Sequence, residues 1–463
     1  METTKHPENQ KPCHTLGNQQ WLHPVSMSPM RPRLPRVKWI LGFLLYFAYL
    51  AFWCTLHPPG SGPDEGSHLN RCLSLSDHPF TLDSTNPLIP SDRATPFDGN
   101  PLLVDSIFQL DRKLSSGDLV ILRQLDWNPP GDHVPAFTYH HHHPTLYYWA
   151  VHGPAHALTQ LCRLSPWDSF LTYRWITALY AAILWMLTLH LAGRALPFRG
   201  TPLLLASLML NPMVIYLSSS VNSDAFTLPI ATWTLLSLII FLRRSHRPAA
   251  FLGGLLTLAS IKASFLPMAA SLFFGLAIAA YLEKARKRRA LLRASMLTGA
   301  VGAGSWAAYY SWNPPYFMGT PAHDSLIEYI VQIPLSLKWM FIHYWGSLGW
   351  QDCTMPEWSY KVIALGTACL GFYGARTLLR PTRWIVRTLL ICLVIFTIVL
   401  FVGEFSRLSV SGHMLSGRYW LPMGLIINMV FLSRHPWVRV ATLVMMLTLN
   451  LYFVWAIQLR YYT

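Results

Sequence analysis

The sequence predicts an all-α protein that crosses a membrane about eleven times. Of its 463 residues, 52% are hydrophobic and only 12% are charged, whereas soluble proteins carry about 25% charged residues. The net charge of +15 comes from Lys and Arg gathered in short loops, as the positive-inside rule expects of cytoplasmic loops. This distribution excludes a nucleic-acid-binding protein, whose basic residues form a stripe on a soluble domain.

The chain begins with a polar segment and then becomes a single transmembrane domain, residues 37–463. The segment, residues 1–36, is rich in Pro, His, Asn and Gln and predicts a disordered, basic cytoplasmic tail. The first span, about Val37 to Leu56, is long enough for a hydrocarbon core of about 30 Å. It is too long for the apolar part of a signal peptide, so we expect it to remain as an anchor.

Two long segments of low apolar character separate the spans, and the predicted topology places both outside the cytoplasm. The first covers residues 58–168, with a short amphipathic helix expected at Asp105–Leu122 and an interfacial helix at Leu146–Cys162. The second covers residues 313–360 and holds another amphipathic stretch at 325–344. Three cysteines are expected on this side, Cys72, Cys162 and Cys353, so one disulfide bond between two of them is possible.

The other spans are expected from apolar runs bounded by basic turns. One apolar block, Ala249–Leu282, has basic residues at both ends, so a single span fails to put both ends in the cytoplasm. We therefore expect a helical hairpin whose tip carries Lys262 to the outer surface. The remaining spans lie at about 170–192, 201–217, 225–242, 290–312, 361–379, 386–405, 419–432 and 438–457.

The stretch Gly62–Arg71, directly after the first span, contains two adjacent carboxylates, Asp64 and Glu65, and a histidine, His68. Asp and Glu are scarce, 21 among 463 residues. A pair at the membrane edge, where ionisable residues are costly and usually functional, therefore predicts the polar centre of an active site. The simpler alternative is a helix start, where acidic groups favour the helix dipole, and the two interpretations are compatible.

Other polar motifs gather at the same face of the predicted topology. Each has a simpler structural interpretation: a helix cap for Asn222 and Asp224, an aliphatic stem reaching the surface for Lys262 and an interfacial anchor for Arg418. Their clustering on one face favours a binding site instead. The candidate substrate-binding residues are His68, His142, His143, Asn222, Asp224, Lys262, Arg418 and Tyr419.

In the order of these motifs the chain resembles a family of bacterial polytopic membrane proteins of unassigned function within the GT-C glycosyltransferase superfamily. The resemblance covers about residues 37 to 457. The chain departs from the family pattern at Thr145, where the family has proline, and at Gly66, also usually proline. The motifs are Pro63-Asp-Glu-x-x-His68, His142-x-Pro-Thr-Leu-Tyr-Tyr148, Asn222-x-Asp224, a Gly-Leu run before Lys262, Trp345-Gly-x-x-Gly-Trp-x-Asp352 and Gly417-Arg-Tyr419.

The resemblance implies transfer of a sugar from a polyprenyl-phosphate donor to a cell-envelope glycan or lipid acceptor at the outer face of the cytoplasmic membrane. It implies Asp64 as the catalytic base, with Glu65 orienting the acceptor or joining Asp64 in binding Mg²⁺ or Mn²⁺. A second carboxylate nearby is expected to raise the pKa of Asp64. Lys262 and Arg418 are candidates for the donor phosphate.

Two other functions stay open at this point. A transporter or flippase of lipid-linked precursors would use the same basic groups, but it needs charges deep inside the spans, where this sequence has few acidic residues. A non-catalytic scaffold for envelope assembly would tolerate changes at Asp64 and Glu65.

Overall fold

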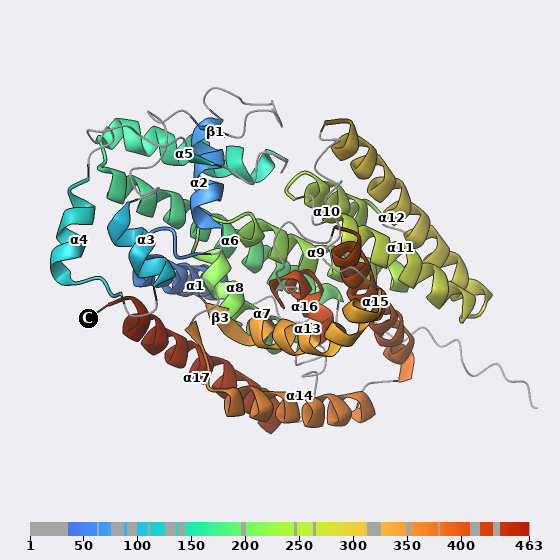
Figure 1. Ribbon diagram of the computed structural model, residues 1–463. Helices are drawn as coiled ribbons and strands as arrows, with labels where there is room; N and C mark the ends of the chain where they lie inside the picture. Colours follow the sequence, from blue (N-terminus) through green and yellow to red (C-terminus); the bar gives the residue numbers. More distant parts are fainter. Residues whose placement is uncertain are drawn as a thin grey trace, which may run out of the picture. The chain divides into compact units, whose positions relative to one another are not determined.

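The structure, a computed structural model (Figure 1), divides the chain into two compact units, Met1–Gly42 and Phe43–Thr463. The expectations for the tail up to residue 35, for His142 and His143, and for Asp352 lie outside the described residues. Those residues are 36–62, 64–75, 88–89, 100–109, 112–125, 136–137, 144–195, 201–244, 248–262, 265–312, 326–348, 353–377, 380–407, 417–428 and 436–462.

The described chain is mostly helical. Up to residue 244 its α-helices are α1 Arg36–Leu56, α2 Glu65–Ser74, α3 Pro101–Phe108, α4 Ser116–Arg123, α5 Leu146–Cys162, α6 Pro166–Ala195, α7 Thr201–Met209, α8 Pro212–Ser218 and α9 Asp224–Arg244. Beyond it they are α10 Ala249–Ala259, α11 Phe265–Tyr281, α12 Ala285–Trp312, α13 Leu326–Gly346, α14 Glu357–Thr377, α15 Arg380–Arg407, the 3₁₀-helix η2 Gly417–Met423, α16 Gly424–Asn428 and α17 Pro436–Tyr461.

Within the described residues, five helices are long and apolar enough to cross a membrane. The expected hairpin is present as two shorter apolar helices, α10 and α11, with Lys262 between them. The total of eleven spans and the side on which each loop lies stay predictions. The five candidate spans are Val37–Leu56, Pro166–Gly193, Asp224–Arg243, Trp384–Val402 and Val440–Tyr461.

Two of these helices carry a continuous apolar stripe on an exposed face. On α15 the stripe recurs every four residues, and on α17 every three or four, which places its members on one side of each helix. Soluble monomers rarely expose large contiguous apolar patches, whereas a lipid-facing helix needs one. The members are Leu390, Val394, Ile398 and Val402 on α15, and Val440, Val444, Leu447 and Leu451 on α17.

The expected span at 201–217 is broken into α7 and α8. Pro212 has no N–H to continue the helical ladder and keeps the preceding residue out of the helical conformation. Asn211 is extended there, and its side chain caps α8 by accepting from the backbone N–H of Met213 at 2.9 Å. The same side chain donates to the backbone oxygen of Tyr344 at 3.0 Å, so the break also joins α8 to α13.

Two further segments, each predicted to be a single helix, are each divided into two helices in the structure. The one at Asp105–Leu122 is replaced by α3 and α4, because Ser115 and Asp118 form a reciprocal capping box that starts a new helix. The span at 419–432 begins as η2, a 3₁₀-helix containing Pro422, and continues as α16. Capping and proline chemistry therefore override apolar periodicity at these places.

The all-α prediction also misses two short antiparallel ladders. β1 Leu88–Ile89 pairs with β2 Ala136–Phe137, and β3 Ser347–Leu348 pairs with β4 Cys353–Thr354. Each strand has only two residues, so each ladder pins two loop segments together and forms no core. The three cysteines considered for a disulfide, Cys72, Cys162 and Cys353, form no disulfide bond with one another.

Close packing between α11 and α15 depends on Gly275. The two helices lie side by side, with α12 on another face of α11 (Figure 1). A Cβ on Gly275 would lie 2.8 Å from the Cα of Cys392, a backbone atom of α15. Such a contact forces the helices apart, because the clash is with backbone and no side-chain rotation relieves it.

We predict opposite effects from the same substitution at two helical glycines. Gly275→Ala lowers the free energy of unfolding by about 1–3 kcal/mol through overpacking. Gly253→Ala, at an exposed α10 position with no atom within 4 Å of a new Cβ, leaves it unchanged or raises it by up to about 1 kcal/mol. Unfolding of the purified protein in detergent measures both, and equal stabilities of the two variants would contradict this packing.

Candidate functional site

A buried ion pair between Glu65 and Arg174 lies at the centre of the region after α1. The guanidinium of Arg174 donates two parallel hydrogen bonds to the carboxylate of Glu65, from Nε to Oε1 at 2.7 Å and from Nη2 to Oε2 at 2.6 Å. Both side chains are shielded from solvent, at 1% and 0% exposure. Arg174 belongs to α6, a candidate span, so Glu65 supplies the countercharge that this arginine needs in an apolar environment.

The same two side chains satisfy the backbone groups of several segments. Arg174 donates to the backbone oxygens of Cys54, His57 and Pro58 at 2.7–2.8 Å, at the end of α1. Glu65 accepts the N–H of Val221, in the turn before α9, at 2.9 Å, and those of Gly60 and Gly62 at 3.2 and 3.3 Å. Every oxygen of Glu65 is therefore occupied, and its role in the structure is to hold these segments together.

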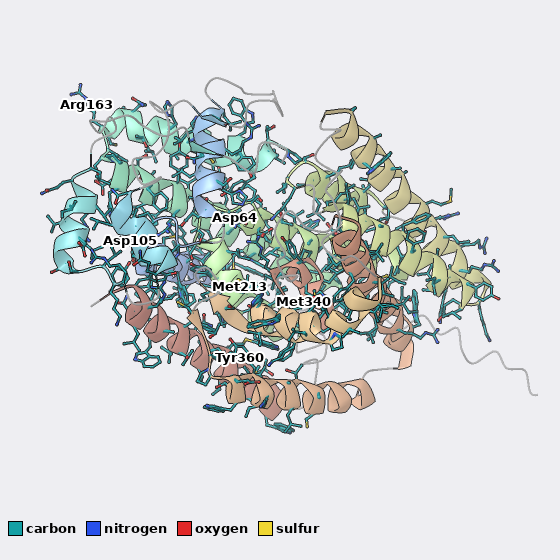
Figure 2. The ribbon with its side chains drawn as sticks, in the orientation of Figure 1. Asp64, Asp105, Arg163, Met213, Met340 and Tyr360 are labelled. Carbon is teal, nitrogen blue, oxygen red and sulfur yellow. The ribbon has the colours of Figure 1, made fainter. Side chains whose placement is uncertain are left out.

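Asp64, the residue next to it, is arranged differently. It occupies the N-cap position of α2 in the left-handed conformation (φ 58°, ψ 16°), yet its side chain makes no capping hydrogen bond. Instead it accepts a hydrogen bond from Nη2 of Arg418 at 2.7 Å. The carboxylate keeps 29% of its surface exposed. Figure 2 labels Asp64 at the start of the blue α2. The helix-start interpretation thus describes the backbone of Asp64 and leaves its side chain unexplained.

The electrostatics of Asp64 differ from the expectation. Burial alone raises the pKa of this carboxyl, but the charge and hydrogen bond of Arg418, followed by the charge of Lys262, bring the pKa below its ordinary value. The expected rise from a neighbouring carboxylate is wrong, because Glu65 faces Arg174 instead. Asp64 is ionised at neutral pH, and it becomes protonated only as the pH falls below the ordinary carboxyl pKa of about 3.9.

A third ion pair joins Lys262, at the tip of the α10–α11 hairpin, to Asp224 at the start of α9. The Nζ–Oδ1 distance is 2.6 Å, and the side chains are 11% and 10% exposed. Lys262 is therefore ion-paired and does not reach out to the surface. This pair and the Asp64–Arg418 pair influence each other. Lys262 lowers the pKa of Asp64. Burial lowers the pKa of Arg418, but the charge of Asp64, and to a smaller extent those of Tyr419 and Asp224, raise it above its ordinary value.

The remaining described candidates have structural partners. Asn222 caps the turn before α9 by accepting from the backbone N–H of Asp224 at 2.9 Å, as the simpler interpretation expected. His68 is buried and shares a 2.8 Å hydrogen bond with the hydroxyl of Tyr148. The ring of Tyr419 lies 5.5 Å from the guanidinium of Arg418. The structure thus brings Asp64, Asp224, Lys262, Arg418 and Tyr419 into one charged cluster beside α2.

The residues do not fit a divalent metal ion held by Asp64 and Glu65. Both oxygens of Glu65 are committed to Arg174 and to backbone N–H groups. In the part of the chain that the structure describes, no three His, Cys, Asp or Glu side chains gather as metal ligands. The single carboxylate of Asp64, already paired with Arg418, is a poor ligand set for Mg²⁺ or Mn²⁺.

Two residues of this region were not found from the sequence. Arg174 had a signal, an arginine inside an otherwise apolar run, which in a span requires a partner. His343 on α13 had none. It is 2% exposed, and neither ring nitrogen has a hydrogen-bond partner among the described residues. Burial, and then the charge of Arg418, lowers the pKa of His343 to about 4, so the ring is neutral at pH 7.

Comparison with models of known protein families gives a match over most of the chain. The model of a family described as "Predicted membrane protein (DUF2142)" matches residues 47–427. No curated protein matches the chain. The matched region includes α2, the α10–α11 hairpin and the segment around Arg418.

We predict that Glu65→Gln strongly destabilises the protein, because it leaves the charge of Arg174 buried without compensation. The expected loss in the free energy of unfolding is about 3–5 kcal/mol. The matched control is Glu357→Gln, which removes an exposed carboxylate 3.1 Å from Lys338 and should change stability by less than about 1 kcal/mol. Unfolding in detergent measures both, and similar small losses would show that the Glu65 pair is not structural.

Proposed function

The chain belongs to the DUF2142 family of predicted membrane proteins, and we propose that it is a glycosyltransferase. It moves a sugar from a polyprenyl-phosphate donor to a cell-envelope glycan or lipid acceptor at the outer face of the cytoplasmic membrane. A metal-independent form of this reaction suits the described residues, since Asp64 and Glu65 are both committed to arginines. The proposal rests on the resemblance in motifs and on the arrangement of Asp64.

The observation that carries the proposal is the orientation of the Asp64 side chain. The left-handed conformation costs a non-glycine residue about 1–2 kcal/mol, although Asp and Asn adopt it more readily than others, and here it gains no helix cap. What it achieves is a partly exposed carboxylate turned toward Arg418, with the neighbouring Glu65 rigidly fixed. Strain kept at one polar residue in this way is typical of a functional position.

In the proposed reaction an acceptor hydroxyl attacks the anomeric carbon of the donor sugar. The new C–O bond forms as the bond between that carbon and the phosphate oxygen breaks, and the phosphate leaves with the electron pair. The hydroxyl proton passes to a carboxylate oxygen of Asp64, which acts as general base. Since Arg418 and Lys262 keep the pKa of Asp64 low, the carboxylate is in its proton-accepting form throughout the neutral range.

Arg418 and Lys262 fit a supporting role better than the phosphate-binding role expected from the sequence. Each already has a carboxylate within 2.7 Å, Asp64 for Arg418 and Asp224 for Lys262. Arg418 orients Asp64 through its hydrogen bond, and the Lys262 pair fixes the hairpin tip against α9. The donor phosphate then needs another cation.

We predict that Asp64→Asn abolishes transfer while the protein stays folded. Asparagine tolerates the left-handed conformation and keeps an oxygen for Arg418, but it does not take up the proton, so the rate should fall by about 10²–10⁴. The measurement is the envelope glycan composition of a strain carrying this variant, beside wild type and a deletion strain, at equal membrane levels of the protein.

Glu357→Gln, which removes an exposed carboxylate elsewhere, serves as the control and should retain the wild-type glycan. If Asp64→Asn loses the same sugar as the deletion, that sugar identifies the donor. A wild-type glycan in this variant, with a defect in the deletion, would reject Asp64 as the base. Accumulation of lipid-linked precursor on the cytoplasmic side in the deletion would indicate a transporter instead.

A further inference from the structure

Arg71, on α2, is a buried arginine in which two of the three guanidinium nitrogens have no hydrogen-bond partner in the described structure. The side chain is 2% exposed. Nη1 donates to the hydroxyl of Ser74 at 3.2 Å, and the guanidinium lies 6.0 Å from the ring centre of Tyr148. Nε and Nη2 are buried and have no hydrogen-bond partner in the described structure. These two atoms form one edge of the planar guanidinium.

The comparison with Arg174 shows what that edge is suited to hold. In Arg174 the same two atoms, Nε and Nη2, grip the two oxygens of Glu65. Arg418 and Lys262 likewise each have a carboxylate. Within the described residues, Arg71 has no carboxylate partner. Burial lowers the pKa of Arg71, but a guanidinium stays charged in proteins.

A buried charge without a countercharge costs several kcal/mol, so its retention requires a reason. The surroundings hold the group in place rather than neutralise it. The hydroxyl of Tyr148 shares a 2.8 Å hydrogen bond with Nδ1 of His68, one helical turn before Arg71 on α2, and the two rings stack at 5.8 Å. Tyr148 and Ser74 thereby fix the guanidinium, and its buried Nε–Nη2 edge has no hydrogen-bond partner in the described structure.

We propose that the Nε–Nη2 edge of Arg71 binds two oxygens of a phosphate ester, and that this ester is the phosphate of the polyprenyl-linked donor. The second part rests on the proposed glycosyl transfer; the first does not. Arginine binds phosphate in this two-bond geometry with charge-assisted hydrogen bonds. Arg71 is preferred to Arg418 and Lys262 because it binds an anion without first leaving a carboxylate.

The position of Arg71 also suits the reaction. In a direct displacement the base and the leaving group lie on opposite faces of the sugar ring. Arg418 touches the base itself, so a phosphate held there would lie on the same face as Asp64. Arg71 follows Asp64 by seven positions, a rise of about 10 Å along an α-helix. We place the sugar residue within that separation, between phosphate and base.

The test measures binding of a short-chain polyprenyl monophosphate to the purified full-length protein in lipid nanodiscs, with the neutral polyprenol of equal length as reference. Wild type should prefer the phosphate. Arg71→Gln should bind it about 10–100-fold more weakly, the loss expected for charge-assisted hydrogen bonds of about 1.5–3 kcal/mol, and should lose the preference over polyprenol. The control, Arg123→Gln, removes an exposed arginine that also lies over an aromatic ring, that of Trp167, and should bind as wild type.

Thermal unfolding separates this role from a structural one. Without ligand, Arg71→Gln should be as stable as wild type or more stable, because an uncompensated buried charge is removed, and only the stabilisation by added phosphate lipid should disappear. Arg71→Lys keeps the charge without the planar edge and should bind less tightly than wild type. If Arg71→Gln does not fold, Arg71→Lys decides the question. Wild-type affinity in either folded variant would overturn the proposal.

Inorganic phosphate identifies the source of the anion. If it displaces the lipid from wild type, the edge recognises phosphate alone; if it does not, the prenyl chain is needed as well. Because binding requires no transfer, Asp64→Asn should retain it. An Asp64→Asn strain with a wild-type glycan, combined with Arg71-dependent binding, would reject the proposed reaction and keep this phosphate site. Loss of the sugar in the Asp64→Asn strain, without Arg71-dependent binding, would reject the phosphate site and keep the proposed reaction.

Discussion

The bidentate contact between Glu65 and Arg174 is the constraint on which the candidate site depends. It joins three parts of the chain that are far apart in sequence: the connection from α1 to α2, the helix α6 and the turn before α9. Because Glu65 is fixed in this way, the residue before it has a defined direction as well. The position of Asp64 is therefore set by a neighbour that takes no part in the proposed chemistry, and the adjacent acids have different roles.

The balance of charge gives the site its second property. Three acids, Asp64, Glu65 and Asp224, each face one cation, which leaves those pairs neutral. Neutral pairs at the edge of an apolar region avoid the large cost of isolated buried ions. They also set apart the Nε–Nη2 edge of Arg71 and the imidazole of His343, which are buried and have no hydrogen-bond partner in the described structure.

The membrane class and most long helices were predictable, because apolar runs bounded by basic turns reflect the bilayer directly. The helix breaks at Asn211 and Ser115 were harder, since local capping overrides apolar periodicity there. Within the site, the sequence pattern identified Asp64, Lys262 and Arg418 as polar residues at predicted span ends. It did not predict which carboxylate pairs with which cationic side chain. Arg418 lies 354 positions from Asp64, and a separation of that size leaves no local pattern to read.

Arg174 also has a consequence for how the protein is made. Arg174 lies in the first third of a candidate spanning helix, where an arginine opposes insertion by at most the about 2.5–3.5 kcal/mol that translocon scales give for the helix centre. Its partner Glu65 precedes it by 109 positions, so with synthesis from the N-terminus the acid emerges from the ribosome well before α6 does. The segment with the costly charge thus enters the membrane after its countercharge exists, whereas the opposite order would leave a charged helix waiting for a carboxylate not yet translated.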